Sequence, residues 1–321
     1  MHALPQADGS VTLRAPAKLN LSLAVLDRRP DGYHDIESLM VPVTLADTVT
    51  VRRAATPGIR LAVRFGGRLG GSALARDVPA DASNLVVRAA TALAEAAGVE
   101  SGLDVELVKE IPSGSGLGGG SSDAAATLMA AARAWGIAWP RQRLAEIAAS
   151  IGSDVPFFLA GTAAIAGGRG ERIEPAADIP PLAAVIVRPA ASLSTPAVYA
   201  ACRPDPGCRG EAARLAAALA AGRFSGAIPW MHNALEEPAR RLCSDVEQAL
   251  AALRRAGGVC PRLTGSGSAC FTLARSAVEA RGIAARLSAQ RHPDGTRRWP
   301  GVFAVRIALA AAARQPALEV A

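Results

Sequence analysis

Hydrophobic and polar residues alternate along residues 11–25, which is the pattern of a β-strand with one buried face. Every odd position from Leu13 to Leu23 is apolar, and most even positions carry polar side chains. The same alternation places Lys18 and Asn20 on one face, about 7 Å apart at the rise of a strand. Either this face is a polar row exposed to solvent, or the two side chains belong to a functional site.

The other segments with a clear period predict interleaved strands and helices. Further strands are expected at residues 36–45, 48–53, 59–65, 104–111, 182–187, 259–263, 269–274 and 302–309. Helices are expected at residues 84–98, 124–135, 141–150, 195–202, 210–221, 233–255 and 276–290. A short turn at Ala46-Asp47 would join the first two of these strands. Because the elements lack a regular parallel βαβ rhythm, the predicted fold class is α+β. Pro180-Pro181 indicates a change of domain, which divides the chain into residues 1–178 and 179–321.

A glycine-rich loop lies between the predicted strand 104–111 and the alanine-rich helix that follows it. The loop is Pro112, Ser113, Gly114, Ser115, Gly116, Leu117, Gly118, Gly119, Gly120, Ser121 and Ser122. Glycines allow a close approach of the backbone and positive φ angles. The N–H groups and the dipole of the following helix N-terminus attract anions. This arrangement predicts a phosphate-binding loop, and a flexible linker is the structural alternative.

The loop matches the dinucleotide-binding pattern G-x-G-x-x-G at Gly114–Gly119, but this pattern is weak evidence by itself. A dinucleotide site also requires an acidic residue about 20 positions further on, at the end of a second strand. The corresponding segment, 138–141, contains none. The Gly-Lys-Ser/Thr of a P-loop is also absent from the sequence.

Four other polar or aromatic residues lie beside predicted turns or helix starts. Tyr33 and His34 follow a turn and could contact a base, or they could be ordinary flanks of a hairpin. Asn84 and Asp154 occupy positions typical of helix N-caps, so the structural alternative is that each only caps a helix. Their residue types are also those that bind nucleotides or accept protons.

Composition limits the class of protein without defining its chemistry. The 321 residues are 50% hydrophobic and 20% charged, and no apolar run has the length of a membrane span. The first residues lack the basic and apolar regions of a signal peptide, and the five cysteines contain no C-x-x-C pair. We therefore expect a reduced, cytoplasmic protein, and the four scattered histidines predict no zinc site.

The net charge of +7 suggests an anionic partner, but the positive residues are spread along the chain. Only 4% of residues are aromatic, so a nucleic-acid partner is not predicted. The 35 basic residues include only two lysines, Lys18 and Lys109. Arginine could serve at most surface positions. Either these two lysines therefore supply a compact ammonium with an adjustable pKa, or they were kept by chance.

Four segments in this order resemble the GHMP small-molecule kinase superfamily. They are Ala15–Leu21 with Asp31–His34, Ile111–Ser122, Gly152–Pro156 and Arg262–Phe271. The order and spacing agree from residue 12 to residue 309. The first segment looks most like that of the kinases of the non-mevalonate isoprenoid pathway, and unlike that of homoserine, mevalonate or galactose kinases.

The resemblance implies a two-domain fold and a nucleotide site. The fold would be an N-terminal domain like ribosomal protein S5 domain 2, followed by a ferredoxin-like domain. ATP would lie across the loop 112–122, with its adenine near Asn84 and Leu85. Mg²⁺ is expected with ATP, and Ser122 is one candidate for a ligand.

The resemblance also implies the acceptor side of the reaction. The γ-phosphate would pass to the 2-hydroxyl of a methylerythritol linked to cytidine diphosphate. Lys18 and Asp154 correspond to the family's catalytic pair, and with Asn20 they would meet the methylerythritol end. The cytosine would meet three rings, those of Tyr33, His34 and Tyr199.

Three alternatives remain open at this level. The chain could be a related homoserine or sugar kinase, which a cytidine-linked acceptor would distinguish. It could be a dehydrogenase that uses the literal glycine pattern, in which case it would bind NAD. It could instead be a basic RNA-binding protein, whose RNA affinity would fall steeply with salt.

Overall fold

The computed structural model describes residues 3–5, 9–67, 69–70, 72, 74–75, 78–176 and 179–307. The end of the last predicted strand, at residues 308–309, lies outside these residues, as does most of the N-terminal segment considered for a signal peptide.

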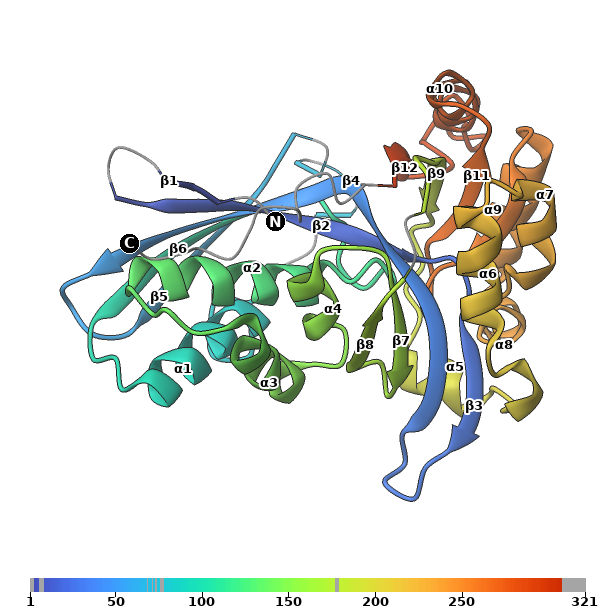
Figure 1. Cartoon of the computed structure of the whole chain (residues 1–321). Coiled ribbons are helices and arrows are strands. Elements are labelled where there is room, and N and C mark those ends of the chain that lie inside the picture. The colour runs from blue at the N-terminus through green and yellow to red at the C-terminus, as the bar shows by residue number, and fades with distance from the viewer. Residues whose placement is uncertain are drawn as a thin grey trace.

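A mixed sheet occupies the first half of the chain (Figure 1). Its strands are β1 (Ala3–Pro5), β2 (Val11–Asn20), β3 (Ala24–Arg28), β4 (His34–Ala54), β5 (Ile59–Phe65), β6 (Gly102–Lys109), β7 (Ala164–Gly168) and β8 (Arg172–Pro175). The main path runs β1-β2-β4-β6-β5, while β3 and β7 pair with β4, and β8 pairs with β7. Among these described strands, only the β5–β6 pair is parallel. The sheet is therefore antiparallel in character, which excludes a doubly wound fold.

Four helices cover one face of this sheet (Figure 1). They are α1 (Leu85–Ala97), α2 (Gly119–Ala134), α3 (Arg141–Ile151) and α4 (Val155–Ala160). The alanine-rich α2 packs on β2 and β4, and almost all of its small side chains are buried. Small residues let α2 lie close to the sheet, which brings the glycine loop before it next to β2.

The turn expected at Ala46-Asp47 does not exist, because β4 continues through it as a single long strand. Asp47 is fully buried, and its carboxylate accepts the backbone N–H groups of Glu110 and Ile111 at 2.5 and 2.7 Å. The side chain also pairs with Lys109. These tertiary partners satisfy a residue that short-range rules assign to turns.

The second half of the chain forms a four-stranded antiparallel sheet with helices around it. Its strands are β9 (Ala183–Arg188), β10 (Val259–Leu263), β11 (Cys270–Ala274) and β12 (Gly301–Arg306), in the order β10-β11-β9-β12. The helices are α5 (Thr195–Ala200), η1 (Pro206–Cys208), α6 (Glu211–Ala220), α7 (Phe224–Ala227), η2 (Ile228–Trp230), α8 (Glu236–Leu242), α9 (Ser244–Arg255) and α10 (Ala277–Ser288). With α9 between β9 and β10 and α10 between β11 and β12, this is the ferredoxin-like arrangement.

The helix predicted at 233–255 is two helices, and the break is at Cys243. Cys243 is extended, with φ −150° and ψ 106°. Pro238 lies in the first turn of α8, where a missing N–H costs nothing.

The two sheets share a hydrophobic core. Leu19 and Val41, from β2 and β4, belong to the same buried cluster as Ile186, Phe271 and Phe303 from the second sheet. An isolated bridge also joins Leu23 to Asn233. The α+β prediction is confirmed, and the shared core fixes the second sheet beside the end of β2.

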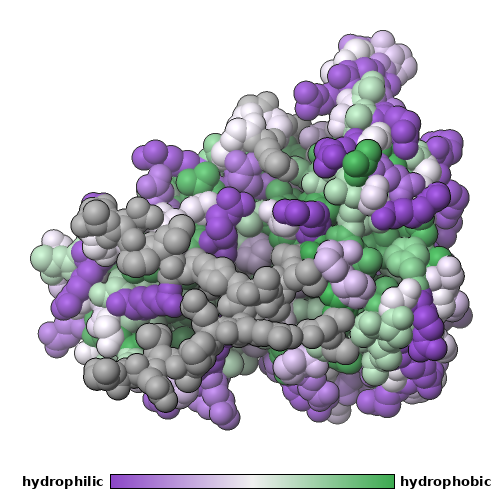
Figure 2. Space-filling model, turned by 45° about the horizontal axis from the view of Figure 1, so that its top comes forward, coloured by the Kyte–Doolittle hydropathy of each residue, from purple (hydrophilic) through white to green (hydrophobic). Residues whose placement is uncertain are grey.

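Figure 2 shows one face of the molecule, on which hydrophilic side chains cover much of the described surface and hydrophobic atoms lie between them. Within the described part of the chain, the longest apolar helices fall short of what is needed to cross a membrane.

Candidate active site

One large cavity, of about 1130 Å³, contains most of the predicted site residues. It lies among the glycine loop, the hairpin of β3 and β4, the start of α4 and a second glycine segment at 264–268. The predicted residues that line it are Lys18, Asn20, Tyr33, His34, Asn84, Leu85, Pro112, Ser113, Gly114, Ser115, Gly116, Gly118, Gly119, Gly120, Ser121, Asp154 and Tyr199. Residues far apart in the sequence are therefore brought to one cavity.

Leu117 and Ser122 are the two predicted site residues that do not line the cavity. Leu117 is fully buried in the shared core, and its carbonyl accepts the N–H of Lys18 at 2.9 Å. Ser122 is also fully buried, and its Oγ has no hydrogen-bond partner among the described residues.

The glycine loop has the backbone geometry that its composition predicts. Gly114, Gly116 and Gly118 have φ angles of 60°, 77° and 71°, which favour glycine. Helix α2 begins at Gly119, earlier than the expected Ala124, so part of the predicted loop is the first helical turn. The N-cap Gly118 has no side chain to cap that turn, so its first N–H groups remain available for an anion.

Lys18 and Asn20 share one face of β2, as the period predicts, but this face is buried. The Nζ of Lys18 donates to the Oδ1 of Asn20 at 2.5 Å and lies 3.8 Å from the Oδ2 of Asp154. Burial lowers the pKa of Lys18, and the carboxylate of Asp154 acts in the opposite direction. The interpretation of this face as a solvated polar row is wrong.

Asp154 occupies the N-cap position of α4, yet its side chain caps nothing. It makes no side-chain hydrogen bond to the helix, and Val155 instead bonds the carbonyl of Gly152. The Asp154 side chain is 34% exposed. A carboxylate that is accessible from the cavity and faces an ammonium is free for chemistry, so capping does not account for this aspartate.

Asn20 connects β2 to the second glycine segment. Its Oδ1 accepts the N–H of Gly265 at 2.9 Å, its N–H donates to Thr264 Oγ1 at 3.1 Å, and its Nδ2 donates to Ser38 Oγ at 2.7 Å. Because these protein partners use most of its bonding capacity, Asn20 holds Lys18 and the 264–268 segment in place.

The two glycine segments contact each other through their backbones. The N–H of Ala269 donates to the carbonyl of Ser115 at 3.1 Å. A Cβ on Gly116 would lie 2.3 Å from the carbonyl oxygen of Thr264. Gly265, Ser266 and Gly267 line the cavity. The second segment therefore closes the site from the side of the second sheet.

Aromatic residues lie at the hairpin end of the cavity. The rings of His34 and Tyr199 are 5.3 Å apart and tilted by 30°. Tyr33 is 54% exposed, and the guanidinium of Arg169 lies 5.0 Å from its ring centre. Burial lowers the pKa of His34 and raises that of Tyr199, where the charge of Asp154 adds to the effect. Tyr199 comes from α5, so the second half of the chain completes this pocket.

Asn84 is the N-cap of α1, as its structural interpretation predicts. Its Oδ1 accepts the N–H of Val86 at 2.9 Å, and its Nδ2 donates to the carbonyl of Pro79 at 2.6 Å. Asn84 and Leu85 also line the cavity, so the cap forms part of its wall.

Two groups at the cavity were not predicted as site residues. Arg169 lies in the β7–β8 turn, where arginine carries no distinctive pattern. Lys109 is one of the two lysines for which a compact ammonium was considered, without a place in a site; its Nζ pairs with Asp47 and, at 2.7 Å, with Asp123. Burial raises the pKa of Asp123 to about 8, in spite of the opposing effect of Lys109. This cluster joins β4, β6 and α2 beneath the glycine loop.

The chain matches two family models over regions that include part of this site. Residues 84–162 match the GHMP kinases N terminal domain, and residues 197–292 match the GHMP kinases C terminal model. The chain belongs to the GHMP kinase family.

Its relatives within the family are more specific. A protein of Rhodopirellula baltica named 4-diphosphocytidyl-2-C-methyl-D-erythritol kinase is 43% identical over 87% of this chain and 91% of its own length. A crystal structure of 4-(cytidine 5'-diphospho)-2C-methyl-D-erythritol kinase is 36% identical, with a TM-score of 0.71 over 92% of this chain and 98% of its own. A homoserine kinase structure from Cytophaga hutchinsonii has a TM-score of 0.69, covers 96% of this chain and 97% of its own, and is 20% identical, which indicates a shared fold.

Proposed function

We propose that the protein transfers the γ-phosphate of ATP to the 2-hydroxyl of 4-diphosphocytidyl-2-C-methyl-D-erythritol, a step of non-mevalonate isoprenoid synthesis. The observation that carries this proposal is a single cavity with a phosphate loop, a lysine–aspartate pair and an aromatic pocket in its wall. The relatives that are named as kinases of this acceptor span most of the chain, so a homoserine or sugar acceptor is less favoured.

The loop would hold the triphosphate through backbone N–H groups. The first N–H groups of α2 have no carbonyl of their own helix to bond, and the helix dipole adds partial positive charge. A Cβ on Gly118 would lie 2.9 Å from Phe158 and 3.0 Å from Lys18, so only glycine allows this approach. Phosphoryl transfer depends mainly on such alignment and charge stabilisation.

Asp154 would accept the proton of the acceptor hydroxyl, and Lys18 would stabilise the charge that develops. The carboxylate has an accessible position 3.8 Å from the ammonium of Lys18. Asn20 acts as a positioning residue, because its amide holds Lys18 and the 264–268 segment together.

Mg²⁺ is expected with ATP, and the donor set fits an ion carried mainly by phosphate oxygens and water. Mg²⁺ commonly uses one or two carboxylates beside substrate phosphates. Ser122 does not fit, because it is buried and does not line the cavity. Asp123 does not fit, because its carboxylate pairs with Lys109. The remaining ligands would be phosphate oxygens and water, and the ion would neutralise phosphate charge.

The cytosine would lie at the hairpin end, against Tyr33, His34 and Tyr199. The close pair of His34 and Tyr199 offers an aromatic wall, and Tyr33 presents an exposed ring for stacking. The adenine of ATP would lie near Asn84 and Leu85, on the opposite side of the glycine loop.

We further propose a cytoplasmic enzyme with two domains, residues 1–178 and 179–321, that acts without a nucleic-acid or membrane partner. Five free cysteines support a reduced compartment. The end of the first sheet at β8 and the start of the second at β9 support the division.

The test is turnover with ATP, Mg²⁺ and the cytidylated acceptor, with homoserine as the competing acceptor. Asp154→Asn should abolish turnover while ATP still binds. Near-normal turnover in that variant would remove Asp154 as the base, and preferred turnover of homoserine would reject the acceptor.

A further inference from the structure

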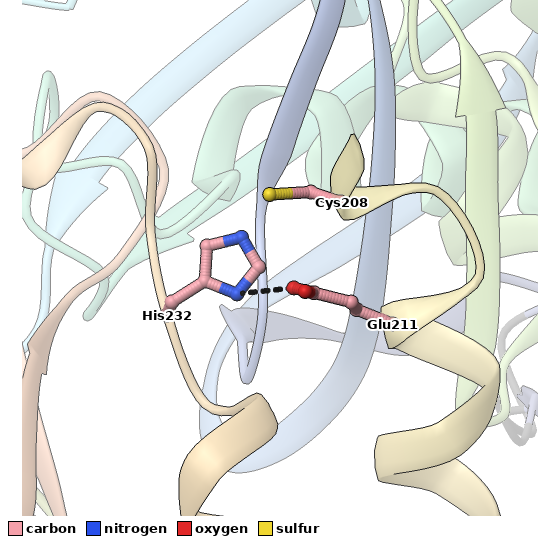
Figure 3. Close-up of side chains that lie close together, drawn as sticks. All are labelled: Cys208, Glu211 and His232. Carbon is pink, nitrogen blue, oxygen red and sulfur yellow. Dashed lines mark ion pairs between the residues drawn. The ribbon is translucent and has the colours of Figure 1, made fainter. Parts of the chain in front are cut away.

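A cluster of metal-binding residue types lies outside the cavity lining. Cys208 ends η1, Glu211 begins α6, and His232 follows η2 (Figure 3). One ligand atom from each of the three lies within 4.8 Å of the others. Three segments thus direct a thiol, a carboxylate and an imidazole toward one point, and the kinase chemistry uses none of them.

The spacing of the ligand atoms can be compared with that of a tetrahedral zinc site. With metal–ligand bonds of about 2.0 to 2.3 Å, neighbouring ligand atoms of zinc should be about 3.3 to 3.6 Å apart. The Nδ1 of His232 pairs with the Oε2 of Glu211 at 3.1 Å, which leaves Nε2 as the nitrogen available to an ion. The Sγ of Cys208 is 3.6 Å from the Oδ2 of Asp205, a further oxygen beside the cluster. To hold an ion, the three ligand atoms, which lie within 4.8 Å of one another, would have to close to this spacing.

The imidazole also has an unused polar atom. The Nε2 of His232 is buried and has no hydrogen-bond partner within the described chain. Figure 3 shows Cys208 on the side of the ring away from the Glu211 contact. Buried polar atoms normally find partners, so this ring is incompletely satisfied by the protein alone.

The segments that carry the cluster are held by backbone contacts with β3 and β4. The carbonyl of His232 accepts the N–H of Leu23 at 2.8 Å, and the N–H of Asp205 donates to the carbonyl of Val25 at 2.8 Å. The carboxylate of Glu37 accepts the N–H of Gly210 at 2.9 Å. The three donors are therefore presented by a fixed frame, as a metal site requires.

The donor types select the metal. A thiolate and an imidazole favour zinc and similar borderline-soft ions over Mg²⁺ or Ca²⁺, which prefer oxygen. We propose that Cys208, Glu211 and His232 bind a zinc ion, with water in the fourth position. The bound ion stabilises the junction of η1, α6 and the segment after η2 with the β3–β4 hairpin. Binding releases the thiol proton, since the thiolate is the ligand.

The experiment uses the full-length chain, stripped of metal by a chelator and then titrated with Co²⁺ as a spectroscopic probe for zinc. Cys208→Ser and His232→Ala remove one ligand each. Cys243→Ser, at the junction of α8 and α9, is the matched cysteine control. Zinc content is measured after dialysis, and thermal unfolding is followed with and without added zinc.

We expect one Co²⁺ per chain, with a thiolate-to-metal charge-transfer band that Cys208→Ser abolishes and Cys243→Ser keeps. His232→Ala should weaken zinc binding more than about 10-fold, since even outer-shell changes cost this much. Added zinc should raise the unfolding temperature of the wild type but not of Cys208→Ser. No thiolate band in the wild type, or a band that persists in Cys208→Ser, would overturn the proposal. These readouts do not depend on kinase activity.

Discussion

A methyl group at Gly116 tests whether the two glycine segments must touch for the site to form. Gly116 has a φ of 77°, and a Cβ there would lie 2.3 Å from the carbonyl oxygen of Thr264 and 3.1 and 3.2 Å from the N and O of Gly267. These neighbours are backbone atoms, so they cannot rotate away. Gly114 is the matched control, because its φ is 60° and a Cβ there would have nothing within 4 Å.

The two substitutions separate strain from overlap. Each places a Cβ on a left-handed backbone, which costs about 1–2 kcal/mol. Only Gly116→Ala adds overpacking, which costs about 1–3 kcal/mol more. Gly116→Ala should therefore unfold at a lower temperature than Gly114→Ala, by about 2–12 °C if the response follows that of domains of 150–250 residues.

The kinetic effect should follow the same order. The carbonyls on either side of Gly116 accept the N–H groups of Ala269 and Lys18. Displacement at Gly116 thus moves both the second segment and the lysine, so kcat should fall in addition to any rise in KM for ATP. Gly114→Ala should act mainly on KM for ATP. Equal stability and equal kinetics of the two variants would refute the idea that this backbone contact builds the site.

Three further predictions concern buried charge and substrate contacts. Lys109→Met leaves Asp47 and Asp123 buried without their cation and should lower the free energy of unfolding by about 3–5 kcal/mol in urea titrations; a loss below about 1 kcal/mol would contradict this. Burial raises the pKa of Asp123 to about 8, so this carboxyl group stays protonated in the folded chain up to about that pH. In the unfolded chain the same group has its usual, lower pKa and loses its proton at a lower pH. Its contribution to stability is therefore greatest at acidic pH and declines, by up to about 1.4 kcal/mol per pH unit, until pH passes about 8. Asp123→Asn should remove this slope from urea titrations at several pH values, and an unchanged slope would reject the assignment. Arg169→Ala removes the cation over Tyr33 and should raise KM for the cytidylated acceptor more than KM for ATP; equal effects on both would exclude a role on the acceptor side.

The sequence alone determined most local structure and the backbone conformation of the glycine loop. The period of two placed Lys18 and Asn20 on one face, and glycine occupies the positive-φ positions of the loop at 114, 116 and 118. These features depend on near neighbours in the chain, so they can be predicted from spacing and residue type. The motifs also indicated the family before any contact was known.

Only the tertiary structure decided which side chains meet. Lys18 and Asp154 come together because α2 and α4 pack on the sheet, and Asp47 remains in a strand because distant N–H groups satisfy its carboxylate. Arg169 and the group of Cys208, Glu211 and His232 carry no local signal at all. Long-range packing sets these positions, since burial and partners from remote segments override the short-range preferences of each residue.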